Sequence, residues 1–239
     1  MPKVRALYHS LNIGTQYPNH KPTTQECKMI DTLVFDYGGV IVNLDDAAVM
    51  SVLDSLGINA LKKLLYASKI KSLVHQYING LVPEEQTLNQ MLAYCRKGVT
   101  INDMLQVLEP LCGHLPKDRL QLLASLRPRY RVFLLSNINH TLWQKSEAEL
   151  RECGYAPSDL FDGLFLSYAM HKAKPQMEIY QELTQQTGLD PAHTLYFDDR
   201  RENADAGRRF GFQSVFVKTN HLEDYPEWQH IVQEAQKAK

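Results

Sequence analysis

Long apolar runs, paired cysteines and an excess of one charge are all missing from this sequence. No apolar stretch approaches the roughly 20 residues that a membrane-spanning helix needs, so no membrane partner is expected. The cysteines, at positions 27, 95, 112 and 153, are scattered and form no Cys-x-x-Cys pair, which argues against a zinc site or a disulfide framework and favours a cytoplasmic protein. Because 26 basic residues face 27 acidic ones, no basic field indicates a nucleic acid partner.

The first 28 residues are polar, contain Pro2, Pro18 and Pro22, and lack the apolar core of a signal peptide. We expect residues 1–28 to form an irregular N-terminal extension. Met29 directly precedes the first predicted strand and is a candidate start of the native chain, which N-terminal sequencing of the native protein would test.

The remaining sequence is typical of a globular protein, with 44% hydrophobic and 22% charged residues. Its most informative stretch runs from Leu33 to Val42, an apolar strand that delivers Asp36 just before Gly38 and Gly39. A strand that is apolar on both faces is typical of a parallel sheet. A buried carboxylate is costly unless it is paired, hydrogen-bonded or bound to a metal, and glycines let a ligand approach the main chain. The stretch therefore indicates either a functional Asp36 or an Asp that caps a turn.

Between this strand and residue 111 the pattern is helical, without a β-rich run. Asp45 or Asp46 is expected to cap a helix that stops at Gly57, Asn79-Gly80 separates two further helices, and a last helix begins near Asn102. The residues spaced to form buried faces are Leu61, Leu64, Leu65, Ile70, Leu88, Met91, Leu92, Met104, Leu105 and Leu108. We therefore predict an α-helical cap over residues 47–111, inserted into a core formed by residues 29–46 and 112–239.

After this insertion, strands and helices alternate. Strands are predicted over residues 130–135, 164–167, 194–197 and 213–217, and helices over 116–126, from 140, around 178–180 and over 203–210. Alternation of this kind implies crossover connections and a parallel sheet. The predicted fold class is α/β, a three-layer Rossmann-like parallel sheet core with an inserted α-helical cap domain.

Asp36, Ser136, Lys174 and the pair Asp198-Asp199 each end a predicted strand or lie in the loop beyond one. Ligands of open α/β sheets bind at that edge, so we expect these side chains to gather there. Taken alone, Ser136 can cap the next helix, Lys174 can be a solvated lysine, and Asp198-Asp199 can form a turn. Their joint order along the chain favours a functional site.

These motifs resemble those of the haloacid dehalogenase-like (HAD) hydrolase superfamily, over about residues 31–217. The first motif, a strand that ends in Asp, matches residues 34–42, and the second matches Leu134-Leu135-Ser136-Asn137. The third matches Lys174-Pro175, and the fourth matches Asp198, Asp199 and Asn203. The helical insertion lies between the first two motifs, as in members of the superfamily with a helical cap.

The resemblance implies a Mg²⁺-dependent phosphatase that acts on a small phosphorylated metabolite such as a sugar phosphate. Asp36 would attack phosphorus and form an aspartyl-phosphate, Ser136 would hydrogen-bond the phosphate, and Lys174 would neutralise charge. Gly38, Gly39 and Asn137 are the further phosphate-binding candidates. The implied Mg²⁺ ligands are the carboxylates of Asp36 and Asp199 and the carbonyl of Gly38, supported by Asp198 and Asn203.

One departure concerns the proton donor. Most phosphatases of the superfamily carry a second Asp two residues after the nucleophile, and this sequence has Gly38 there. The run Gly38-Gly39-Val40 is similar to a subset with a D-x-G-[GN]-V motif that includes a bacterial glucose-1-phosphate phosphatase. Another group must then protonate the leaving oxygen, and His75, Tyr77 and His140 are weak candidates that are more often ordinary surface or packing residues.

Two alternatives stay open at this point. A 2-haloacid dehalogenase shares the fold and the Asp nucleophile, but it works without metal and has no use for a doubly acidic corner at Asp198-Asp199. A binding or regulatory protein that has lost turnover is the other alternative, and Gly38 is the feature that favours it.

Overall fold

The computed structural model describes residues 29–58, 60–107 and 113–237. The predicted N-terminal extension over residues 1–28 and the predicted core residue Leu108 lie outside these ranges. Within them, no helix combines the length and the apolarity needed to cross a membrane.

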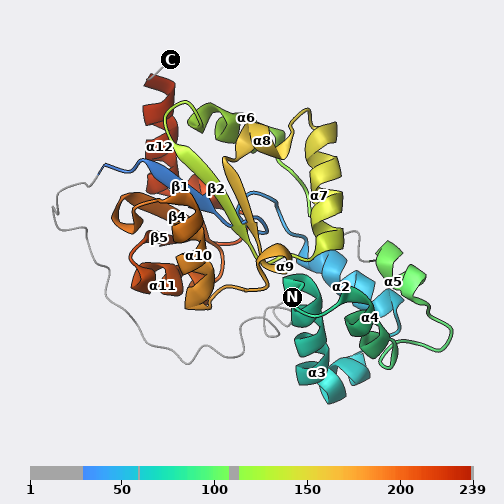
Figure 1. Ribbon diagram of the computed structural model, residues 1–239. Coiled ribbons are helices and arrows are strands. Elements are labelled where there is room, and N and C mark those ends of the chain that lie inside the picture. Colours follow the sequence, from blue (N-terminus) through green and yellow to red (C-terminus); the bar gives the residue numbers. More distant parts are fainter. Residues whose placement is uncertain (1–28, 59, 108–112, 238–239) are drawn as a thin grey trace.

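A five-stranded parallel sheet forms the centre of the molecule, in the order β3-β2-β1-β4-β5 (Figure 1). Its strands are β1 (Thr32–Phe35), β2 (Arg131–Ser136), β3 (Gly163–Leu166), β4 (Thr194–Asp198) and β5 (Gln213–Phe216). All four residues of β1 and all five of β4 are buried, as the apolar runs predicted for strands covered on both faces. The predicted α/β fold is therefore confirmed.

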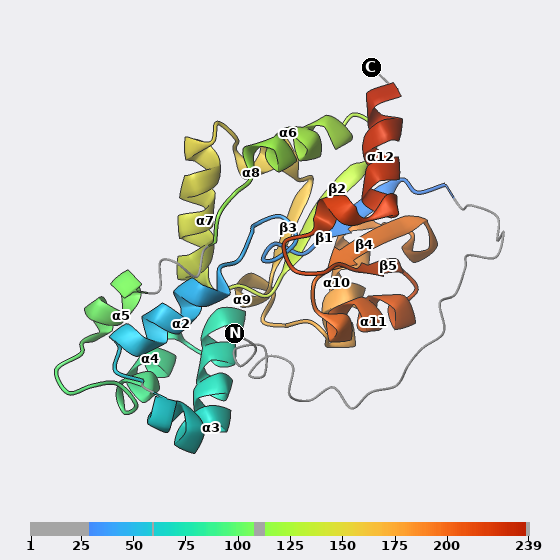
Figure 2. The ribbon, with the colours of Figure 1, turned by 180° about the vertical axis from the view of Figure 1, so that it is seen from behind.

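Helices cover both faces of this sheet (Figures 1 and 2). On one face, Leu33 and Phe35 belong to a core that includes residues of α6 (Lys117–Leu126), α7 (His140–Glu152) and α12 (Pro226–Lys237). On the other face, Val34 and Tyr196 pack with residues of α10 (Met177–Thr187) and α11 (Arg201–Phe210). Successive strand residues point to opposite faces, so alternate residues of β1 serve the two cores.

The insertion between β1 and α6 is helical, as predicted, and its helices gather together beyond one end of the sheet (Figure 1). They are α2 (Asp46–Ser55), α3 (Ala60–Asn79), α4 (Glu84–Leu92) and α5 (Ile101–Val107). Asp45 caps α2, because its Oδ1 accepts hydrogen bonds from the amides of Ala47 at 2.9 Å and Ala48 at 3.1 Å. Ile70, Leu88, Met91 and Met104 are buried as predicted. The domain boundaries themselves stay a prediction.

Several short elements and the last helix were not foreseen. They are α8 (Pro157–Leu160), α9 (Ser167–Met170), the 3-10 turns η2 (Pro191–His193) and η3 (Leu222–Asp224), and α12. Ser167, predicted as the end of β3, instead begins α9, and its hydroxyl oxygen lies 2.5 Å from the carbonyl oxygen of Asn79 and 3.0 Å from that of Ile138, within hydrogen-bond distance of both. These bonds tie the end of α3 to the core, close to the carboxyl edge of the sheet.

Candidate active site

Strand register brings the predicted acidic residues together. Phe35 of β1 pairs with Leu134 of β2 and with Phe197 of β4. The next residue, Asp36, therefore lies beside Asp198, and its amide donates to the carbonyl of Phe197 at 2.9 Å. The predicted gathering of Asp36 and Asp198 at the carboxyl edge of the sheet is what the structure shows.

Lys174 joins these two carboxylates from the loop before α10. Its Nζ lies 2.9 Å from Asp36 Oδ1, 2.7 Å from Asp198 Oδ2 and 2.8 Å from the carbonyl oxygen of Leu135. The side chain is fully buried, and its ammonium group thus has three oxygen partners for its three hydrogens. This geometry fixes the lysine between the predicted nucleophile and the fourth motif.

Asp198 is saturated with hydrogen-bond donors. Its Oδ1 accepts from the amide of Arg200 at 2.8 Å, its Oδ2 accepts from Lys174 and from the hydroxyl of Tyr196, and the side-chain amide of Asn203 reaches both oxygens at 3.1 and 3.2 Å. A carboxylate with this many donors has little capacity left for a metal ion. The contacts indicate that Asp198 and Asn203 hold Lys174 in place.

Asp199 differs from its neighbour. Its Oδ2 accepts a hydrogen bond from the hydroxyl of Thr219 at 2.7 Å, and no hydrogen bond to its Oδ1 is found within the described residues. Gly39 lies directly against it: a Cβ atom at Gly39 would stand 2.3 Å from Asp199 Oδ2, and φ of Gly39 is +76°. A glycine is therefore required there, because any side chain would collide with this carboxylate.

Among the described residues, Lys174 is the one lysine that contacts this cluster, and it pairs with Asp36 and Asp198 but not with Asp199, which leaves excess negative charge. Burial is the largest effect and raises the pKa of Asp36, with Lys174 opposing it and Asp198 adding to it. Burial, with Asp36 and Asp198 nearby, raises the pKa of Asp199 to about 7. Burial works against the charged form of Lys174, yet Asp198 and Asp36 raise its pKa above the usual value, so the charged form is favoured.

Asp36, Asp198 and Asp199 each offer one oxygen, and these oxygens lie within 4.8 Å of one another. Hard carboxylate oxygens are the ligands that Mg²⁺ prefers, and a divalent cation would offset the charge that Lys174 leaves uncompensated. The three carboxylates, and the close approach of Gly39 to Asp199, therefore fit Mg²⁺. Asp36 and Asp199 are better placed than Asp198 to bind it directly, because hydrogen-bond donors already surround Asp198.

Two polar groups at the end of β2 differ in what they contact. Ser136 is buried, and no partner for its hydroxyl is found in the described part of the chain. Asn137, by contrast, uses its side chain on the backbone of Lys174: Nδ2 donates to the Lys174 carbonyl and Oδ1 accepts from the Lys174 amide, both at 2.9 Å. The phosphate-binding role predicted for Asn137 stays a prediction, and its observed contacts orient Lys174.

Gly38 has room for a side chain. Its φ is not in the left-handed region, and a Cβ atom would meet only Leu44, at an ordinary 3.5 Å. The backbone conformation at this position and the space around its Cβ therefore do not demand a glycine.

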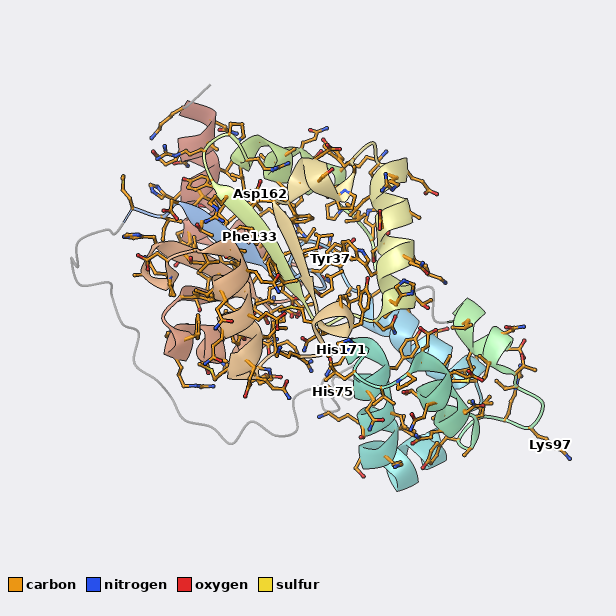
Figure 3. The ribbon with its side chains drawn as sticks, viewed as in Figure 1. Tyr37, His75, Lys97, Phe133, Asp162 and His171 are labelled. Carbon is orange, nitrogen blue, oxygen red and sulfur yellow. The ribbon has the colours of Figure 1, made fainter. Side chains whose placement is uncertain are left out.

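The three candidate proton donors occupy different surroundings. His75 is exposed near the end of α3 that faces the core and lies within 3.2 Å of the Asn79 amide (Figure 3). Tyr77 is buried, and its carbonyl accepts from the side chain of Asn139 at 2.8 Å. His140 begins α7 and packs edge-on against Tyr168. None of these contacts involves Asp36, so a role as proton donor for any of them stays a prediction.

Three residues that shape the site, Tyr196, Thr219 and Asn220, were not predicted from the sequence. Tyr196 reads as one apolar strand position, and Thr219 and Asn220 lie beyond the last motif. The ring of Tyr37, the residue after Asp36, packs edge-on against Trp143, with ring centroids 5.6 Å apart. Only the alternation of β4 could have suggested that Tyr196 and Asp198 share a face.

The sequence and the fold are similar to those of known proteins. Residues 30–211 match a family model described as haloacid dehalogenase-like hydrolase. One relative, D-ribitol-5-phosphate phosphatase from Bacteroides thetaiotaomicron, is 28% identical over 188 residues, which cover 78% of this chain and 91% of that protein. A HAD family enzyme from the same organism superimposes with a TM-score of 0.76 at 26% identity, covering 85% of this chain and 98% of that one. A structure of a HAD family enzyme of that organism with magnesium and inorganic phosphate gives a TM-score of 0.70 at 27% identity, covering 80% and 96% of the two chains.

Proposed function

We propose that this chain, which belongs to the haloacid dehalogenase-like hydrolase family, is a Mg²⁺-dependent phosphatase that hydrolyses a small phosphorylated metabolite through an aspartyl-phosphate. Membership of the family and the phosphatase relative support a phosphoric monoester hydrolase. The observation that carries the proposal is the convergence of Asp36, Asp199 and the Lys174–Asp198 pair at one edge of the sheet.

Asp36 is the proposed nucleophile. Its Oδ1 accepts from Lys174 at 2.9 Å and from the amide of Tyr37 at 2.7 Å, which leaves Oδ2 to attack phosphorus. As the new O–P bond forms, the bond between phosphorus and the leaving oxygen breaks, and that oxygen takes up a proton. Water then attacks the phosphorus of the aspartyl-phosphate, releases inorganic phosphate and restores the Asp36 carboxylate.

Charge neutralisation falls to Lys174 and to the metal. Asp36, Asp199 and the carbonyl of Gly38 would hold Mg²⁺, which supplies positive charge to a phosphate dianion as it meets a carboxylate. Lys174 stays protonated and faces Asp36, while Asn137 and Asp198 fix its backbone and its ammonium group. Ser136, at the end of β2, would donate its hydroxyl hydrogen to a phosphate oxygen, and Gly38 and Gly39 remain phosphate-binding candidates in the loop after Asp36.

The leaving oxygen must receive its proton without an acidic side chain at Gly38. Bound water or a hydroxyl of the substrate can supply it, and a polyhydroxylated leaving group carries such hydroxyls. We therefore propose a sugar phosphate or sugar-alcohol phosphate as the substrate class, in agreement with the substrate in the name of the Bacteroides relative. Glucose 1-phosphate is one member of this class to test. The cytoplasmic location predicted from the scattered cysteines forms part of the same proposal.

The test is phosphate release from a panel of sugar and sugar-alcohol phosphates, with Mg²⁺ and then with a chelator. We expect release that depends on Mg²⁺ and falls by at least about a thousandfold in Asp36→Asn, which keeps the side-chain volume but removes the nucleophilic oxygen. Asp159→Asn is a matched control, because Asp159 is an exposed carboxylate that accepts a hydrogen bond from the amide of Ala156 at 2.7 Å, remote from the acidic cluster in sequence. Halide release from 2-haloacids instead would establish the dehalogenase, and binding without turnover would establish the binding protein.

A further inference from the structure

We propose that Asn220, together with Arg119 and Glu223, positions the loop that follows the nucleophile and thereby sets the geometry of the reaction. We call residues 218–224 the clamp segment. It follows β5 and lies outside residues 30–211, which match the family model. The inference deepens the proposed function, on which its kinetic part rests.

Asn220 holds both ends of the loop from Gly39 to Leu44. Its backbone amide donates to the carbonyl of Gly39 at 2.7 Å. Its side chain pairs with the backbone of Leu44, where Oδ1 accepts from the amide at 2.7 Å and Nδ2 donates to the carbonyl at 2.8 Å. The residue adopts φ of +67°, a left-handed conformation that asparagine tolerates better than most side chains.

Arg119 holds the middle of the same loop. One terminal nitrogen donates to the carbonyls of Val40 at 2.8 Å and Ile41 at 3.0 Å and to Asn43 Oδ1 at 3.0 Å. Its Nε and the other terminal nitrogen form a two-pronged ion pair with Glu223 at 2.6 and 2.8 Å. Arg119 is 3% exposed, so this paired guanidinium is a buried, rigid link between the loop and the clamp segment.

The clamp segment also contacts Asp199, one of the proposed Mg²⁺ ligands. Thr219, the residue before Asn220, donates to Asp199 Oδ2 at 2.7 Å. One short segment therefore contacts Asp199 on one side and the loop after Asp36 on the other. Because reacting groups must be held within a fraction of an ångström, a link between these two parts controls how well they face a shared phosphate.

The loop also leads into the helical insertion. Asn43 and His114, one on each connection between core and insertion, exchange two backbone hydrogen bonds of 2.8 Å. Leu44, which Asn220 holds, directly precedes the cap of α2 at Asp45. The clamp segment is thus placed to position the nucleophile loop and the base of the insertion together.

Asn220→Gly is the decisive variant, because glycine keeps the positive φ and the amide bond to Gly39 and removes only the side chain that holds Leu44. With p-nitrophenyl phosphate and Mg²⁺ we expect kcat to fall about tenfold or more, with KM changed less than about threefold. Glu223→Gln, on a half-exposed side chain, weakens the pair with Arg119 and should lower kcat in the same direction. Gln213→Ala is the control, since it removes a surface hydrogen bond to the carbonyl of Ala192 at 3.0 Å.

Amide hydrogen exchange of the loop, measured with chelator present, gives a readout that needs no turnover. We expect peptides covering residues 39–44 to exchange faster in Asn220→Gly than in the wild type or in Gln213→Ala. A lower melting temperature with unchanged kcat and unchanged exchange of this loop would overturn the inference, as would normal kcat in both clamp variants. If the wild-type chain released no phosphate at all, the proposed function would fail, while faster exchange of residues 39–44 would still support the clamp.

Discussion

Replacing Lys174 with methionine removes one buried charge and nearly preserves the side-chain volume. The ammonium group contacts Asp36 Oδ1 at 2.9 Å and Asp198 Oδ2 at 2.7 Å, and both carboxylates are buried. Removing one partner of a buried ion pair typically costs about 3–5 kcal/mol, because the other charge stays buried without compensation. A chain of this size loses about 2–4 °C of melting temperature per kcal/mol, so a decrease of about 6–20 °C is expected in metal-free protein.

The pH dependence of this loss has a definite sign. Burial raises the pKa of Asp36, and it raises the pKa of Asp199 to about 7. An acid whose pKa is raised by folding destabilises the fold at pH values above the raised pKa. That cost shrinks as the pH falls below the raised value and disappears below the ordinary pKa of the unfolded chain. Without Lys174 the cost is larger, so the difference between Lys174→Met and wild type should be full near pH 8 and shrink toward pH 5.

Urea unfolding at several pH values, with chelator and then with Mg²⁺, measures the free energy of unfolding of Lys174→Met and of the wild type. Mg²⁺ at a hundred times its dissociation constant adds about 2.7 kcal/mol to a protein that binds it only when folded, so part of the loss should be recovered. Lys172→Met is the matched control, because Lys172 pairs with Glu182 near the surface and should cost less than about 1 kcal/mol. The reasoning would be refuted if Lys174→Met lowered the free energy of unfolding by less than about 1 kcal/mol at pH 8, or if its difference from wild type grew toward pH 5.

Two substitutions in the loop after the nucleophile separate its roles. Gly38→Asp should fold normally, because the atoms nearest a Cβ there belong to Leu44, at 3.5 Å. It should raise the turnover of alkyl phosphates relative to p-nitrophenyl phosphate by about tenfold or more, since an added acid helps only poor leaving groups. An unchanged ratio of the two turnover rates in steady-state assays would contradict this. Gly39→Ala should cost about 1–2 kcal/mol from its positive φ and in addition raise the Mg²⁺ concentration needed for activity, because its Cβ would stand 2.3 Å from Asp199 Oδ2. Gly188→Ala has a similar φ of +65° with nothing within 4 Å, so a matching rise in its Mg²⁺ requirement would show that the Gly39 effect is not local.

Local patterns in the sequence determined the α/β fold and the edge at which its polar residues meet. The apolar run ending at Asp36, the run ending at Ser136 and the run ending at Asp198 each predicted a buried strand, and parallel strands place their carboxyl ends at one edge. Helix caps and stops such as Asp45 and Gly57 similarly marked the insertion, because capping depends on neighbours within one turn. Where both ends of a strand or helix were predicted, as for β2 and α6, they differed from the observed ends by only one or two residues.

Only the tertiary structure decided which contacts, and therefore which roles, each polar residue of the site has. Asp198 and Asp199 are adjacent acids with no local difference, yet one is enclosed by Lys174 and Tyr196 and the other meets only Thr219 among the hydrogen-bond donors of the described chain. The clamp segment was equally hidden, because Asn220 contacts Leu44 across 176 positions of sequence. Propensity and periodicity act within a few residues, whereas such contacts arise only when the sheet has brought distant segments together.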